Sequence, residues 1–194
     1  MTYRFKDINK LAIPAIISGI AEPLLSLTDT AIVGNIPNDS INALAAVGIA
    51  GSFISAMVWI LAQTRSAISA IIARNYGADK LGEVKTLPSQ ILLINVVLSL
   101  LLYVLTVYFA EEIFMLYNAD GTILETAVSY YKIRAIGIPL SLIVFTLFGV
   151  FRGMQNTFWP MIIAISGAVL NIVLDYVLVF GIGDWIPEMG VIGA

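Results

Sequence analysis

Apolar stretches of about 20 residues recur along the chain, and this is the length of α-helix needed to cross the hydrocarbon core of a bilayer. The composition agrees, because 59% of the 194 residues are hydrophobic and 12% are charged. We therefore predict an all-α fold, a polytopic membrane helix bundle, in which the second stretch is one long tilted helix. Segments rich in Asn, Gly, Pro and charge separate five stretches, which cover residues 11–34, 43–76, 87–110, 130–151 and 158–183.

Missing residue types exclude several classes of function. The chain has no Cys and no His, so disulfides, Cys/His metal sites and His-based catalytic pairs are not available to it. The net charge of −3 is small and its charges are scattered, which argues against a nucleic-acid partner. We predict a membrane protein that is not an enzyme, needs no cofactor and binds no nucleic acid.

The basic residues on the two sides of the predicted membrane differ in number. Seven Lys and Arg lie on the side of the N-terminus, and two lie on the other side, at the start of the fourth stretch. Because basic loops stay in the cytoplasm, we predict a multi-pass protein of the inner (plasma) membrane with a cytoplasmic N-terminus. The seven are Arg4, Lys6, Lys10, Arg74, Lys80, Lys85 and Arg152, and the two are Lys132 and Arg134.

Two acids interrupt the first stretch, in the segment AEPLLSLTDTAIVG. Glu22 and Asp29 share a helix face with Ser18 and Ser26, at spacings of four, four and three residues. Ionisable groups are costly in hydrocarbon, so they indicate a functional site that faces other helices or water. The central position of Glu22 favours function, whereas Asp29, about five residues from the end of the stretch, suits a headgroup position equally well.

Pro14 and Pro23 lie in the same apolar stretch as the two acids. Each lacks a backbone N–H donor and can kink a helix, so we predict that this stretch can change shape. For Pro14 alone, a place in the first helical turn, where proline is tolerated, is an equally good explanation.

The fifth stretch carries a matching polar pair in the segment NIVLDYVLVF. Asn171 and Asp175 are four residues apart, which makes them neighbours on one helix face. A carboxylate beside a carboxamide suits a proton or a cation, because the amide either donates to the carboxylate or offers its oxygen to an ion. The alternative is a structural hydrogen bond between helices, worth ~0.6 kcal/mol on average in membranes.

Several segments in order along the chain carry a family resemblance: LAIPAI, AEPLLSLTDTAIVG, ALAAVGIA, ARNYGA, FRGMQNTFWPM and NIVLDYVLVFG. The chain resembles the multidrug and toxic compound extrusion (MATE) family, and within it the DinF-like branch. Members of that family have twelve transmembrane helices in two six-helix lobes. The resemblance implies that residues 1–194 supply the first five helices of the N-terminal lobe, with the C-terminal lobe of the same protein as partner.

The resemblance also assigns roles to individual residues. Asp29 matches the first-helix aspartate, and Pro14 matches the proline associated with bending of that helix. Asn171 and Asp175 match the fifth-helix pair, and with Asp29 they look like the site that binds a proton or, in some members, sodium. Glu22, a feature of the DinF-like pattern, is a further coupling candidate. The fourth stretch departs from the family, because IVFTLFGVF lacks the asparagine that some members use.

The activity that the resemblance implies is secondary active antiport. Such a protein exports amphipathic, often cationic, organic compounds in exchange for protons or sodium ions. Two alternatives stay open: a lipid-linked precursor flippase of the same superfamily, and a non-transporting membrane scaffold subunit that uses its polar residues only as helix contacts. A second lobe of similar hydropathy would favour a transporter over a scaffold.

Overall fold

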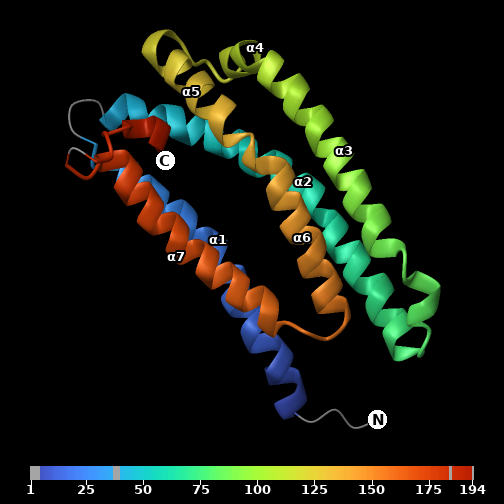
Figure 1. The fold of residues 1–194 in the computed structure, drawn as a ribbon. Coiled ribbons are helices and arrows are strands. Elements are labelled where there is room, and N and C mark those ends of the chain that lie inside the picture. The colour runs from blue at the N-terminus through green and yellow to red at the C-terminus, as the bar shows by residue number, and fades with distance from the viewer. Residues whose placement is uncertain (1–4, 37–39, 184, 194) are drawn as a thin grey trace.

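The computed structural model describes residues 5–36, 40–183 and 185–193 of the chain. This part of the chain is helical apart from short connections and one isolated bridge between Ile182 and Ile186 (Figure 1). The elements are α1 (Phe5–Gly34), α2 (Ser40–Gly77), η1 (Leu81–Val84), α3 (Leu87–Tyr108), α4 (Ala110–Met115), α5 (Gly121–Arg134), α6 (Gly137–Gly153), α7 (Phe158–Phe180) and η2 (Gly190–Gly193).

The helices have the length and the apolar surface of a membrane protein. Within the described ranges, four are long and apolar enough to cross a bilayer, and the bent pair α5 and α6 makes five if it counts as one span. Most of their large apolar side chains are exposed on the outside of the bundle, where a bilayer would cover them. The predicted all-α membrane bundle is confirmed.

Helix α2 runs through the polar residues near its middle without a break. It spans 38 residues, which confirms the prediction of one long helix. Two of its polar side chains donate to carbonyls of its own backbone, Gln63 to Trp59 at 3.0 Å and Thr64 to Leu61 at 2.9 Å. Such bonds satisfy polar side chains inside an apolar helix.

Residue 130, the predicted start of the fourth span, lies inside helix α5. Helix α5 begins at Gly121, and the chain bends by 46° before α6 begins at Gly137. Pro139 has no N–H to donate to the carbonyl of Ala135, and its ring crowds that carbonyl, so the helix breaks there. Arg134 ends α5 as a partly buried residue, with its side chain 34% exposed.

Two other predicted boundaries shift by a few residues. Helix α3 ends at Tyr108, and the next residues, predicted as a loop, form the short helix α4. Helix α7 ends at Phe180 because Gly181 adopts a φ of +72°, which side-chain-bearing residues rarely adopt.

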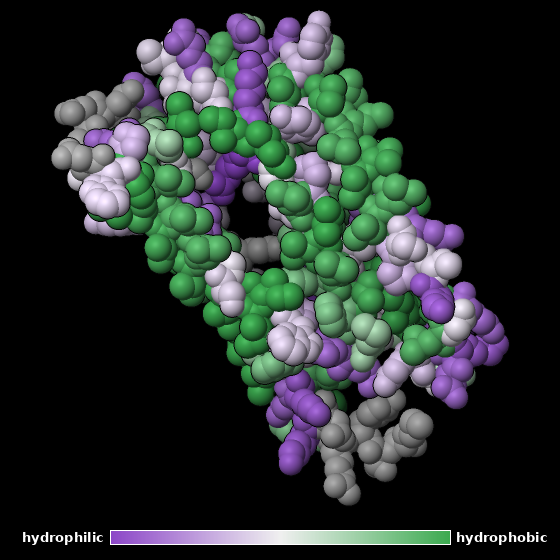
Figure 2. Space-filling view, viewed as in Figure 1, coloured by the Kyte–Doolittle hydropathy of each residue, from purple (hydrophilic) through white to green (hydrophobic). Residues whose placement is uncertain are grey.

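The helices form two arms. Helix α1 packs along α7 in the first arm, whereas α2 packs along α6, and α6 along α3, in the second. Helices α4 and α5 lie at one end of the second arm (Figure 1). Figure 2 shows an opening between the arms, with hydrophilic surface on part of its wall and apolar surface over the outer faces of the helices.

Two glycines allow α2 and α6 to approach closely. A Cβ added at Gly149 would lie 2.7 Å from the carbonyl oxygen of Arg65, and a Cβ at Gly153 would lie 2.7 Å from Cβ of Ile72. Both distances are too short for real atoms, so only glycine fits. The spacing of four residues is the GxxxG pattern by which membrane helices bring their backbones together.

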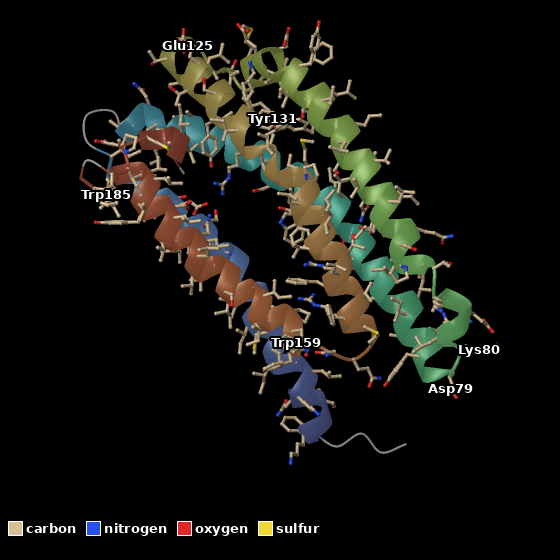
Figure 3. The ribbon with its side chains drawn as sticks, in the orientation of Figure 1. Asp79, Lys80, Glu125, Tyr131, Trp159 and Trp185 are labelled. Carbon is tan, nitrogen blue, oxygen red and sulfur yellow. The ribbon has the colours of Figure 1, made fainter. Side chains whose placement is uncertain are left out.

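An aromatic cluster fixes the position of α5. The rings of Phe53 (α2), Phe114 (α4) and Tyr131 (α5) have centroids 5.3–6.0 Å apart. Tyr131, labelled in Figure 3, donates its hydroxyl to Thr106 Oγ1 of α3 at 2.5 Å. Because Tyr131 is fully buried, this core holds the last turn of α5, and with it Arg134, in one place relative to α2 and α3.

Candidate functional site

Asp29 of α1 and Asp175 of α7 lie together between the two helices of the first arm. Their exposed fractions are 6% and 4%, and the two carboxyl groups lie close enough to interact electrostatically. Asp29 is therefore covered by protein and does not face lipid. We refer to Asp29 and Asp175 as the acid pair.

Asn171 supports the acid pair from one turn earlier in α7. Its Nδ2 donates to Asp175 Oδ1 at 3.2 Å. The structure therefore brings together the three residues that the sequence predicts to share a site. The amide donates an N–H group to the acid pair. Its chemistry also allows a second arrangement, in which the amide oxygen binds an ion.

Arg134 is a member of the site that sequence reasoning missed. Its Nη2 donates to Asp29 Oδ2 at 2.8 Å, in an ion pair between α5 and α1. The guanidinium also lies over the ring of Tyr130, 5.6 Å from the ring centroid, which favours a cation through the negative face of the ring. A signal was present in YYKIRAIGIP, where an aromatic residue precedes Arg134 by one helical turn and Gly and Pro follow it.

The acid pair has two oxygens that no protein donor reaches. Asp29 Oδ1 and Asp175 Oδ2 are buried and accept no hydrogen bond from the described residues. An ionised carboxylate only accepts hydrogen bonds, so two carboxyl groups in contact need a proton or a cation between them. The arrangement can therefore hold and release one small positive charge.

The other polar residues predicted on α1 do not all join the site. Ser18 is buried and accepts a hydrogen bond from Arg152 Nη2 at 3.0 Å. Ser26 is exposed, against prediction, because at about 100° per residue it lies roughly 60° around the helix from Asp29. The side chain of Glu22 lies outside the described part of the chain.

Both predicted bending residues lie inside α1. The helix begins at Phe5 and contains Pro14 and Pro23, so the alternative that Pro14 sits in the first turn is wrong. The turn around Pro14 receives support from outside the helix, since Thr157 Oγ1 donates to the carbonyl of Leu11 at 3.0 Å. Whether α1 bends in use stays a prediction.

A buried asparagine lies in α3, whereas the predicted fourth span has none. Asn95 of α3 is 1% exposed and donates to Thr64 Oγ1 at 2.9 Å and to Thr146 Oγ1 at 2.8 Å. This group joins α2, α3 and α6 within the second arm. We assign it a structural role.

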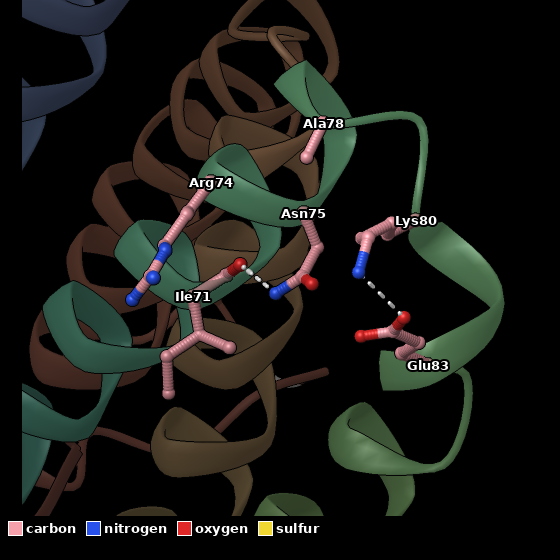
Figure 4. A pocket seen from close by; sticks show the side chains of 6 residues that line it. All are labelled: Ile71, Arg74, Asn75, Ala78, Lys80 and Glu83. Carbon is pink, nitrogen blue, oxygen red and sulfur yellow. Dashed lines mark hydrogen bonds and ion pairs between the residues drawn. The ribbon is translucent and has the colours of Figure 1, made fainter.

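Two cavities of the described part of the chain do not include the acid pair in their walls. One of about 500 Å³ is at the far end of α2 (Figure 4), where Lys80 and Glu83 form an ion pair at 3.1 Å beside Arg74. The other, of about 390 Å³, lies between α1 and α7 and is lined by Thr28, Asn35 and mostly apolar neighbours. Neither is lined by Asp29 or Asp175.

Comparison with known proteins gives consistent matches. "DNA damage-inducible protein F" of Escherichia coli is 31% identical over 182 residues, which cover 94% of this chain and 39% of that protein. "Probable multidrug resistance protein NorM" of Thermotoga maritima is 29% identical, with 97% and 40% covered. The chain thus spans about 40% of the length of these relatives.

A solved structure has the same fold. The outward-facing conformation of a multidrug resistance MATE family transporter of the MOP superfamily superposes with a TM-score of 0.84 at 26% identity, over 97% of this chain and 40% of that one. The family model MatE matches residues 14–177. With an apolar helical bundle and a buried acid pair between its first and last long helices, the chain belongs to the MatE family of membrane transporters.

Proposed function

We propose that this chain forms the N-terminal lobe of a secondary antiporter, which exports amphipathic, often cationic, organic compounds in exchange for an inward proton or sodium ion. The observation that carries the proposal is the buried acid pair of Asp29 and Asp175, with two oxygens that receive no hydrogen bond from the described residues. Buried acids are costly in a membrane, and they mark proton and ion pathways.

The location of the acid pair suits coupling. Asp29 and Asp175 belong to the two helices of the first arm, and Arg134 reaches them from the second. Loss of a proton or cation leaves a negative charge at the contact between the arms, and its return removes that charge. Pro14 and Pro23 give α1 two weak turns through which a change of charge would become a change of shape.

Orientation and partner complete the proposal. The excess of Lys and Arg near the N-terminus favours a cytoplasmic N-terminus in the inner (plasma) membrane. The remaining length of the relatives favours a C-terminal lobe of the same protein as the partner, with the substrate between the lobes. An organic cation suits such a site, because acidic groups and aromatic rings both attract positive charge.

Efflux of a fluorescent dye tests this proposal. The full-length protein would be reconstituted into vesicles, loaded with ethidium and exposed to an imposed pH gradient or sodium gradient. Efflux that depends on one gradient, and stops when an ionophore collapses it, is expected. Efflux that ignores both gradients refutes coupled antiport.

A further inference from the structure

A positively charged side chain of the protein lies beside the acid pair. Arg134 binds one oxygen of Asp29 at 2.8 Å and is held over the ring of Tyr130. We propose that the positive charge of Arg134 prevents sodium from binding at the acid pair, so that the pair binds a single proton. This inference rests on the proposed function and specifies its coupling ion.

The first step is an account of the four carboxyl oxygens. Asp29 Oδ2 accepts from Arg134, and Asp175 Oδ1 accepts from Asn171. One oxygen of each acid remains without a donor among the described residues. A bridging proton needs only two oxygens, whereas a hard metal cation needs a shell of several oxygen ligands. Arg134 has only N–H groups, which cannot bind a cation, and Asn171 presents its N–H group to Asp175 in this structure.

The second step is an account of charge. Among the described residues, the charged or titratable groups that face one another include Asp29 from α1, Tyr130 and Arg134 from α5, and Asp175 from α7. Residues 40–64 of α2, the half that starts next to α1, contain no Asp, Glu, Lys or Arg. With Tyr130 neutral, two carboxylates and one guanidinium sum to −1, so a single proton makes the site neutral.

The third step concerns the position of Arg134. A sodium ion near the two free oxygens would lie close to the guanidinium, and two positive charges a few ångströms apart inside a membrane protein repel strongly. The core around Tyr131 holds this end of α5, so Arg134 has a fixed starting point close to Asp29. Without this charge, the same oxygens would be open to sodium.

Sodium binding measures the inference directly. Equilibrium binding of ²²Na⁺ to the purified full-length protein would be compared between wild type, Arg134→Gln and Lys132→Gln. Lys132 is an exposed residue of the same helix, so its variant is a matched control for loss of one positive charge. Wild type and Lys132→Gln should show no sodium binding that depends on Asp29. Arg134→Gln should gain this sodium binding, with an affinity at least about tenfold above the upper limit set for the wild type.

Two further variants make every outcome decisive. Asp29→Asn identifies the binding that belongs to this site and separates it from any in the other lobe. Arg134→Lys keeps the charge and should exclude sodium as the wild type does. Sodium binding by the wild type that disappears in Asp29→Asn refutes the inference, even if Arg134→Gln does not fold. Dye efflux that ignores both gradients refutes the proposed function alone, since binding is measured without transport.

Discussion

Removal of the charge on Asp29 should destabilise the lobe through Arg134. In Asp29→Asn the shape of the side chain is kept, but Arg134 Nη2 loses the carboxylate that it binds at 2.8 Å. A partly buried guanidinium is then left beside a neutral amide. We therefore expect a folded but weakened protein, and not only a loss of coupling.

The exposed fractions of the two side chains set the size of the effect. Surface ion pairs contribute about 0–1 kcal/mol, and breaking a fully buried pair costs about 3–5 kcal/mol. The side chain of Asp29 is 8% exposed and that of Arg134 is 34% exposed, so the pair lies between these cases. We expect Asp29→Asn to lower the free energy of unfolding by about 2–3 kcal/mol.

A double-mutant cycle measures this interaction. Unfolding of the full-length protein by SDS in mixed micelles would be followed for wild type, Asp29→Asn, Arg134→Gln and the double variant. The sum of the losses of unfolding free energy in the two single variants should exceed the loss in the double variant. The difference, which is the coupling free energy, should be at least about 1 kcal/mol. Coupling free energy below about 0.5 kcal/mol would show that the ion pair does not link α5 to α1 in the membrane protein.

Three other predictions concern the acid pair, the contact between α2 and α6, and a proline in α1. Asp175→Asn keeps the Asp29–Arg134 ion pair, so unfolding free energy should change by less than about 1 kcal/mol while dye efflux loses its dependence on pH; a shift of the pH profile without its loss would assign the proton elsewhere. Gly149→Leu should cost about 1–3 kcal/mol or more in unfolding free energy, because its Cβ meets Arg65 and Ile68, whereas Gly167→Leu, with nothing within 4 Å, is the neutral control. Pro14→Ala restores a backbone donor and should raise stability by up to about 3 kcal/mol and slow efflux; faster efflux would contradict a bending role.

Hydropathy alone predicts the spans of this chain, because the bilayer imposes one length on every helix that crosses it. Residues 43–76 are read as one helix for that reason, and α2 confirms it. The break between α5 and α6 is harder to predict, since apolar residues continue through it. Only Gly137 and Pro139 mark the point, and the same residue types occur inside unbroken α1.

The predicted site is incomplete for a related reason. Asp29, Asn171 and Asp175 stand out as polar residues within apolar stretches. Arg134 stands at the edge of such a stretch, where basic residues usually report topology and not chemistry. Its partner is 105 residues away in the sequence, and the contact arises only because α5 bends away from α6 and its end is held by Tyr131.

Arginines near the C-terminal ends of α5 and α6 attach the first arm to the second. Arg134 at the end of α5 binds Asp29, and Arg152 near the end of α6 binds Ser18, which lies three turns earlier in α1. Pro23, with no backbone donor, falls between these two contacts. A bend of α1 there cannot leave both contacts unchanged. Among the described residues, the contact to Asp29 is the one that adjoins the acid pair, so under the proposed function ion binding sets the shape of α1 at that contact.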